Sequence, residues 1–163
     1  MAADPVQAKT TDGCPDTGEL ALLQQWRALH SGVQRLTDGL LADVEAEQGL
    51  APSSFQALMF LVTAPGRAAP MNRLSAALGF STAGTTKVVD RLAHAGLVER
   101  RPSDADRRVV YTSLTPAGAE TVLAASRTLA HALRTRVVAP LGEDLFRMFA
   151  DAVGSLAPGD GGC

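Results

Sequence analysis

The stretch STAGTTKVVDRLAHAGLVERRPSDADRRVVYTS, residues 81–113, decides the fold. Its first part predicts a helix with Ser81 as the N-cap, because a serine hydroxyl can accept from the unpaired amides of a helix's first turn. Gly96 suits the left-handed position that ends such a helix. The helix would turn an apolar stripe inward, formed by Val88, Val89 and Leu92.

Two short β-prone runs follow that helix, Leu97–Val98 and Val109–Tyr111. Turn-forming residues and arginines separate them, which predicts a hairpin. A polar-faced helix followed by an arginine-rich hairpin is typical of a winged helix-turn-helix. In that arrangement the helix fits the major groove of DNA and the hairpin tip can reach the adjacent minor groove. The sequence therefore predicts a mainly α fold with a small β wing.

Apolar spacing predicts further helices on both sides of this module. A heptad-like seam indicates a long first helix, and its members are Leu22, Trp26, Leu29, Val33, Leu36 and Leu40. Ser53 and Ser54 are expected to cap a helix over residues 55–62, and a short helix is expected over residues 71–78. After the hairpin, Thr115-Pro116 opens a helix that runs to Pro140, and a last helix covers residues 142–156.

The expected organisation follows from this order of elements. It comprises a disordered tail over residues 1–18, a dimerisation helix over 19–49, a DNA-binding module over 50–115, C-terminal dimerisation helices over 116–157 and a flexible tail over 158–163. The terminal helices display more apolar surface than one small module can cover, which favours a homodimer. A two-fold dimer would place its recognition helices about 34 Å apart, in successive major grooves.

Charge is distributed unevenly along the chain. The 163 residues have a formal net charge of −2, yet residues 67–108 hold eight basic and four acidic side chains. A basic middle between acidic flanks suits phosphate contact through one face of the protein. The alternative is a solvated surface on which the charges cluster by chance.

Several classes of protein are disfavoured by the sequence. The two cysteines, Cys14 and Cys163, exclude a disulfide scaffold and a cysteine-based zinc site. No signal peptide or membrane span is recognisable, so we expect a cytoplasmic protein. The three histidines belong to no paired ligand motif, and no phosphate loop or nucleophile elbow is present, so we expect neither a metal, a cofactor nor an enzyme.

The segments MNRLSAALGFSTAGTTKVVDRLAHAGLVER and RRPSDADRRVVYTSLTPAG together resemble the MarR family of bacterial winged-helix regulators. The resemblance covers residues 19–156. It implies a dimeric regulator, in most cases a repressor, that binds a pseudo-palindromic operator in double-stranded DNA and is released by a small-molecule effector. Activation in place of repression stays open.

The resemblance also implies which residues touch DNA. Those expected on the recognition helix are Ser81, Thr82, Thr85, Thr86, Lys87 and Arg91. In the wing, Arg108 would enter the minor groove, aimed by Asp106, with Arg107 near phosphate. A hairpin-tip ion pair with no role in DNA binding is the alternative reading of Asp106 and Arg108.

An effector pocket is a further implication of the resemblance. Its expected lining is Trp26, His30, Phe55 and Met59, suited to a small aromatic or phenolic ligand. Trp26 and His30 are four residues apart and so share a helix face. Trp26 as an ordinary core residue and His30 at a dimer edge are the alternatives. Two other functions stay open: a redox-responsive regulator using Cys14, and a helical dimer that binds a ligand or protein without DNA.

Overall fold

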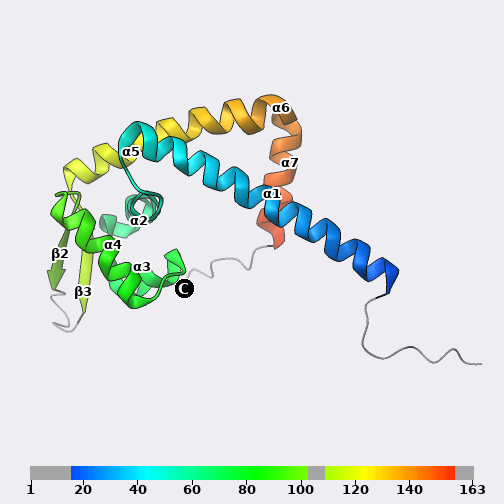
Figure 1. Cartoon of the computed structure of the whole chain (residues 1–163). Helices are drawn as coiled ribbons and strands as arrows, with labels where there is room; N and C mark the ends of the chain where they lie inside the picture. Colours follow the sequence, from blue (N-terminus) through cyan, green and yellow to red (C-terminus); the bar gives the residue numbers. More distant parts are fainter. Residues whose placement is uncertain (1–15, 103–108, 157–163) are drawn as a thin grey trace, which may run out of the picture. The chain divides into compact units, whose positions relative to one another are not determined.

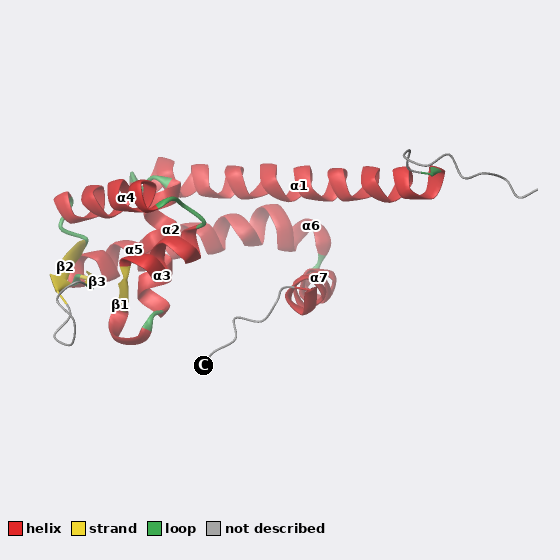
Figure 2. Ribbon diagram, turned by 90° about the horizontal axis from the view of Figure 1, so that it is seen from below, coloured by secondary structure: helices red, strands yellow, loops and turns green. Residues whose placement is uncertain are grey.

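The structure, a computed structural model, describes residues 16–102 and 109–156. The chain divides into two compact units, residues 1–37 and 38–163. The long helix α1 (Thr17–Gln48) begins in the first unit and ends in the second. Figure 1 and Figure 2 show the course of the chain and the labels of its elements.

The first unit consists of the N-terminal part of α1. Asp16 and Glu19 form a reciprocal cap, since each side chain accepts the other residue's backbone amide at 2.8 Å. Beyond the cap, the apolar seam is exposed to solvent, with 61% of Trp26 accessible. The rings of Trp26 and His30 stack at a centroid distance of 6.1 Å, so the two side chains share one face.

The second unit holds the remaining elements. They are α2 (Pro52–Thr63), the 3-10 turn η1 (Pro65–Arg67), β1 (Ala68–Pro70), α3 (Met71–Leu78), α4 (Thr82–His94), β2 (Val98–Pro102), β3 (Val110–Leu114), α5 (Pro116–Leu133), the π-helical turn η2 (Arg134–Val138), α6 (Ala139–Leu141) and α7 (Glu143–Leu156). The fold is mainly helical with one small sheet, which confirms the predicted fold class.

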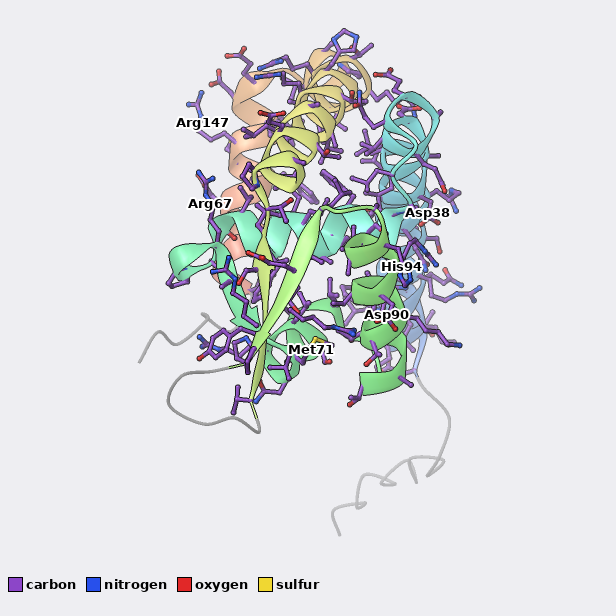
Figure 3. The ribbon with its side chains drawn as sticks, turned by 90° about the vertical axis from the view of Figure 1, so that its left-hand side faces the viewer. Asp38, Arg67, Met71, Asp90, His94 and Arg147 are labelled. Carbon is purple, nitrogen blue, oxygen red and sulfur yellow. The ribbon has the colours of Figure 1, made fainter. Side chains whose placement is uncertain are left out.

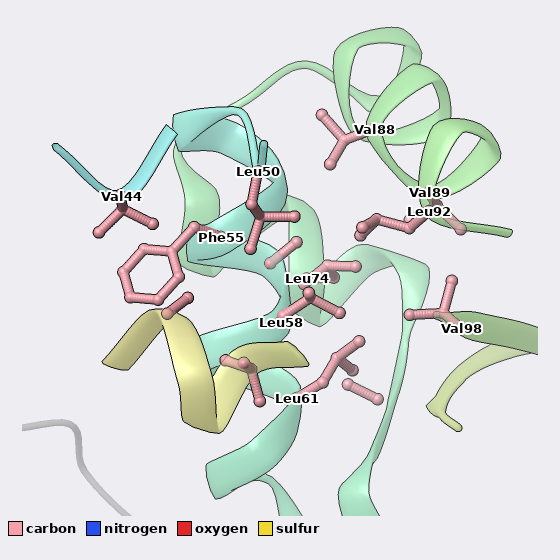
Figure 4. Close-up of a cluster of buried hydrophobic side chains, with 14 residues drawn as sticks. Val44, Leu50, Phe55, Leu58, Leu61, Leu74, Val88, Val89, Leu92 and Val98 are labelled. Carbon is pink, nitrogen blue, oxygen red and sulfur yellow. The ribbon is translucent and has the colours of Figure 1, made fainter. Parts of the chain in front are cut away.

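The core of this unit lies among α2, α3, α4 and the sheet (Figure 4). Leu58 and Leu61 of α2 have no exposed surface, and neither has Leu74 of α3. Val89 and Leu92 of α4 pack in the same cluster as these leucines, and Val98 extends the cluster to the start of the wing. Burying each such side chain stabilises the fold by about 1.5–3 kcal/mol.

The sheet has the strand order β1-β3-β2, and both pairs are antiparallel. Val98 pairs with Leu114 at the base of the wing, while Ala68 pairs with Ser113 on the other side of β3. The strand β1 was not predicted, because three residues that include a proline are too few to show an alternating pattern.

Polar contacts tie the end of α1 to α5 and η2. Both carboxylate oxygens of Asp43 lie 2.7 Å from Nη2 of Arg136. One turn further along α1, the Thr128 hydroxyl donates to the Glu47 carboxylate at 2.9 Å. These contacts fix the last turns of α1 on the second unit, where Val44 joins the core.

Two sequence expectations were wrong in detail. Ser53 and Ser54 do not cap α2; the helix begins at Pro52, whose fixed φ and missing amide suit the first helical position. The helix expected to run from Thr115-Pro116 to Pro140 is interrupted by η2, where the Ala139 amide donates to the Arg134 carbonyl. This wide turn lies directly before Pro140, which cannot donate to Arg136 in an α-helical register.

None of the helices in the described part of the chain is long and apolar enough to span a membrane. Likewise, residues 16–102 and 109–156 contain no group of three His, Cys, Asp or Glu side chains placed to hold a metal ion.

Leu58→Ala should lower the free energy of unfolding by about 2–5 kcal/mol, because the removed methyl groups leave a cavity that the packed core cannot close. Leu123→Ala is the matched control, since Leu123 of α5 is 51% exposed; its effect should stay within about 0.5 kcal/mol. Urea unfolding monitored by circular dichroism measures both. Equal losses in the two variants would contradict the assignment of the core.

Candidate nucleic-acid interface

The start of α4 is set by a turn and a cap. Gly79 adopts the left-handed conformation (φ 65°) and ends α3. Two residues later, the Ser81 hydroxyl accepts the backbone amide of Gly84 at 3.1 Å. This confirms the predicted N-cap. The cap satisfies the Gly84 amide, one of the amides that the start of a helix leaves without an intrahelical partner.

One face of α4 is buried. Val88, Val89 and Leu92 point into the core, as predicted. Thr85 joins them with no exposed surface, and its hydroxyl donates to the Ser81 carbonyl at 3.1 Å. The expectation that Thr85 contacts DNA is therefore corrected, because its side chain does not reach the protein surface. Its spacing from Val88, Val89 and Leu92 places it on the apolar stripe, and the sequence already carried that signal.

The opposite face of α4 carries exposed polar and basic side chains. Thr82, Lys87 and Arg91 are exposed, and Thr86 is half-buried. The Thr86 hydroxyl donates to the Thr82 carbonyl at 2.8 Å, which leaves its methyl group and lone pairs on the outer side. Ala83, which was not among the predicted contact residues, is exposed and lies four residues before Lys87. A small apolar side chain there allows close approach of a partner to the helix.

Two ion pairs organise the charges beside α4. Arg100 of β2 contacts Asp90 of α4 at 2.7 Å, and Arg101 pairs with Glu99 within β2. Figure 3 shows Asp90 and His94 one turn apart near the end of α4. The Arg100 and Asp90 side chains are 38% and 44% exposed, so this pair contributes about 0–1 kcal/mol to stability. Its larger effect is to tie the wing to the helix.

The ion pairs determine which basic side chains of this surface have no acidic partner among the described residues. Asp90 and Glu99, the acidic side chains that the structure describes between residues 67 and 102, are engaged by arginines. Lys87 and Arg91 form no ion pair with any residue that the structure describes. The outer face of α4 thus presents positive charge, as a phosphate-binding surface requires.

Several predicted site residues lie outside the described residues. Asp106, Arg107 and Arg108, expected at the wing tip, fall in residues 103–108, and Cys14 falls in residues 1–15. The structure does place β2 and β3, the two strands that lead into and out of residues 103–109.

The expected effector residues are divided between the two units. Phe55 and Met59 line a cleft of about 270 Å³ between α2 and α3. The other members of its lining are Gln56, Phe60, Ala77 and Leu78. The Ser126 hydroxyl of α5 donates to the Val122 carbonyl at 2.6 Å and lies 3.1 Å from the Met59 sulfur, so the wall of the cleft contacts α5. Trp26 and His30 belong to the first unit.

This arrangement of helices and wing has counterparts among known proteins. A family model described as the MarR family matches residues 48–109. The transcriptional repressor MprA of Escherichia coli strain K12 is 38% identical over 73 residues, an alignment that covers 45% of this chain and 42% of MprA. Over these residues the chain is similar to MarR family regulators. It spans less than half the length of this curated relative, and the family model covers α2–α4 and the wing strand β2.

Solved structures match over most of the chain. A MarR family transcriptional regulator from Streptomyces coelicolor, Sco3205, solved in complex with DNA, superposes with a TM-score of 0.75 at 22% identity, covering 94% of each chain. The transcriptional repressor CouR, bound to a 23-mer DNA duplex, has a TM-score of 0.73 at 26% identity, covering 90% of this chain and 100% of CouR. The MarR winged-helix fold is thus shared along both units.

Proposed function

We propose that this chain is a sequence-specific DNA-binding transcriptional regulator, a repressor that acts on a pseudo-palindromic operator. The observation that carries this proposal is the split of α4 into a buried face and an exposed face on which Lys87 and Arg91 form no ion pair with a described residue. The match of residues 48–109 to the MarR family model, together with proteins of the same fold solved on DNA, supports it. Such a protein works where the genome is, so we place it in the bacterial cytoplasm.

In this proposal the first turns of α4 enter the major groove. Thr82 and Thr86 can bond base edges or phosphates, and the Ala83 methyl group can contact a thymine methyl group. Lys87 supplies an ammonium to a phosphate or a guanine edge, and Arg91 contacts the backbone. Ser81, occupied as the cap, contributes through the position that it gives the helix.

The wing supplies a second contact. Arg108 would enter the minor groove, oriented by Asp106, and Arg107 would lie near phosphate; a narrow minor groove attracts an arginine through its enhanced negative potential. Arg100 and Arg101 are anchored by carboxylates at the base of the wing. We assign them to shaping the wing, with the DNA contacts left to its tip.

Fluorescence anisotropy with DNA from around the chain's own gene tests the DNA-binding function, with random DNA as control. Lys87→Ala should weaken binding and lower the slope of log affinity against log salt concentration by about one, since one cation leaves the interface. Arg147→Ala on α7 removes the same charge elsewhere and should change neither quantity. An unaltered slope in Lys87→Ala, or binding by the wild type that is equal on all DNA, would contradict the proposal.

The active species in this proposal is a homodimer. The apolar face of α7 is exposed although it has the composition of a core: Leu145, Met148, Phe149, Val153 and Leu156 are each more than 40% accessible. The apolar seam on the first unit is equally open to solvent, from Leu22 to Val33. Contiguous apolar surface of this extent marks a protein interface. The occupant we propose is a second copy of this chain, whose symmetry would give the two half-site contacts.

Leu145→Glu should shift the protein toward the monomer, because the new carboxylate would be buried without a partner in the interface. Ala150→Glu adds the same charge to the opposite, polar face of α7 and should leave the dimer intact. Light scattering coupled to size-exclusion chromatography measures the mass of each variant. A monomeric wild type, or a dimeric Leu145→Glu at low micromolar concentration, would contradict the dimer proposal.

We further propose that the cleft between α2 and α3 takes the effector, a small aromatic or phenolic acid. Phe55, Phe60 and Met59 supply apolar walls, and Gln56 adds a polar amide. A ligand seated beside Met59 would act on the Ser126 contact, and hence on α5. To release DNA it must bind the DNA-incompetent arrangement better than the competent one.

A series of hydroxybenzoates titrated into the protein–DNA complex tests this cleft. At least one should lower the anisotropy of labelled DNA, and Met59→Glu should abolish that response by placing a charge in the apolar wall. Arg127→Glu, on the exposed face of α5, controls for the added charge. Release that persists in Met59→Glu would place the effector site elsewhere.

A further inference from the structure

Three elements meet at the junction between the recognition helix and the wing. The helix α4 ends at His94, and Gly96 takes up the left-handed conformation (φ 70°). The Leu97 amide donates a hydrogen bond to the Leu92 carbonyl at 2.9 Å, and β2 begins at Val98. The backbone of Gly96 and Leu97 therefore sets the direction in which the wing leaves the helix.

Thr115, the residue before α5, forms hydrogen bonds with this turn. Its amide donates to the Leu97 carbonyl at 3.1 Å. Its hydroxyl lies 2.8 Å from the Gly96 carbonyl and 3.0 Å from the Leu97 carbonyl, and its single proton is shared between these two acceptors. The same hydroxyl oxygen accepts the Gly118 amide at 3.0 Å, which caps α5. One side chain thus performs two separable tasks, accepting from α5 and donating to the turn.

Gly118 shows how closely the first turn of α5 lies against the junction. A Cβ atom added at this buried glycine would stand 2.0 Å from the Leu97 carbonyl oxygen and 3.0 Å from the Leu114 side chain. No side chain fits between the two backbones. The turn is therefore held between the Thr115 hydroxyl and the Gly118 backbone, with little room to rotate.

We propose that Thr115 is a positioning residue for DNA binding, whose hydroxyl holds the Gly96–Leu97 turn and so sets the wing at a fixed angle to α4. The inference rests on the proposed DNA-binding function. A protein that contacts two grooves at once needs its two contacting elements placed to within about 0.5 Å of the productive geometry. The Arg100–Asp90 ion pair bridges the same elements further out, but it is exposed and weak. The angle between the wing and α4 is therefore set mainly by the contacts of Thr115 with the Gly96–Leu97 turn.

Three substitutions separate the two tasks of Thr115. Thr115→Ser keeps the cap and the donor. Thr115→Asp keeps the cap, since aspartate is a preferred N-cap residue, but a carboxylate cannot donate to the Gly96 and Leu97 carbonyls. Thr115→Val loses both. Ala117→Asp adds the same charge to the exposed first turn of α5 and controls for electrostatic repulsion of DNA.

Specific and non-specific DNA affinity, thermal unfolding and amide hydrogen exchange are measured for each variant. We expect Thr115→Asp to stay folded but to melt somewhat below the wild type, because the donor to the turn is lost. We expect it to lose about tenfold in specific affinity, because a smaller fraction of the protein holds the wing in the binding-competent position. Non-specific affinity should change little in any variant. In the free protein, the Leu97 and residue-115 amides should exchange faster in Thr115→Asp than in Thr115→Ser or Ala117→Asp.

The outcomes separate the positioning role from its alternatives. If Thr115→Asp binds the operator like Thr115→Ser, the hydroxyl is only a helix cap and the positioning role is overturned. An equal loss in Ala117→Asp would overturn it as well, by assigning the effect to charge. If the wild type binds no DNA specifically, the DNA-binding function fails; unchanged exchange in Thr115→Asp would then show that the turn is not held by the hydroxyl.

Discussion

The burial of one ridge of α4 is the constraint on which the rest of the structure depends. Thr85, Val88, Val89 and Leu92 recur at helical spacing, and all four are withdrawn from solvent. Once they are buried against α2 and α3, the opposite ridge through Ala83, Lys87 and Arg91 has to face outward. The cap at Ser81 and the left-handed glycines at either end then set where that outer face begins and ends.

Ion pairing determines the charge of this exposed face. The sequence as a whole is slightly acidic, which argues against a nucleic-acid partner if only the total is considered. The structure shows that Asp90 and Glu99 are engaged by Arg100 and Arg101. Asp90 and Glu99 therefore lower the positive potential of this surface only slightly. The Arg100–Asp90 pair also connects β2 with α4, although the turn at Gly96 and Leu97 sets the direction of the wing.

Much of this could be predicted from the sequence because the signals are local. The cap at Ser81, the stop at Gly96, the helix at Met71–Leu78 and the start of α5 at Thr115-Pro116 each depend on a few adjacent residues, and all are confirmed. The strand β1 depends on pairing with β3, more than forty residues away, and so left no local pattern. The wide turn η2 depends on Pro140 acting backward along the helix, which periodicity does not record.

The functional residues also differ in whether a local sequence pattern could predict them. Thr82, Lys87 and Arg91 of α4 are exposed, so a DNA contact at these residues stays a prediction, whereas Thr85 lies on the apolar stripe and is buried. The contacts of Thr115 with Gly96 and Leu97 join residues 18 and 19 positions apart, and only the folded chain brings them together. The contacts proposed for Asp106, Arg107 and Arg108 stay predictions from the resemblance.

A methylation-protection footprint on the bound operator tests the central claim most directly, because dimethyl sulfate reports guanine N7 atoms in the major groove. Two copies of α4 in successive major grooves predict two protected clusters on one face of the duplex, about one helical turn (10–10.5 base pairs) apart. Protection confined to a single cluster, or binding that leaves every guanine N7 reactive, would contradict an α4 that reads the major groove as part of a two-fold dimer.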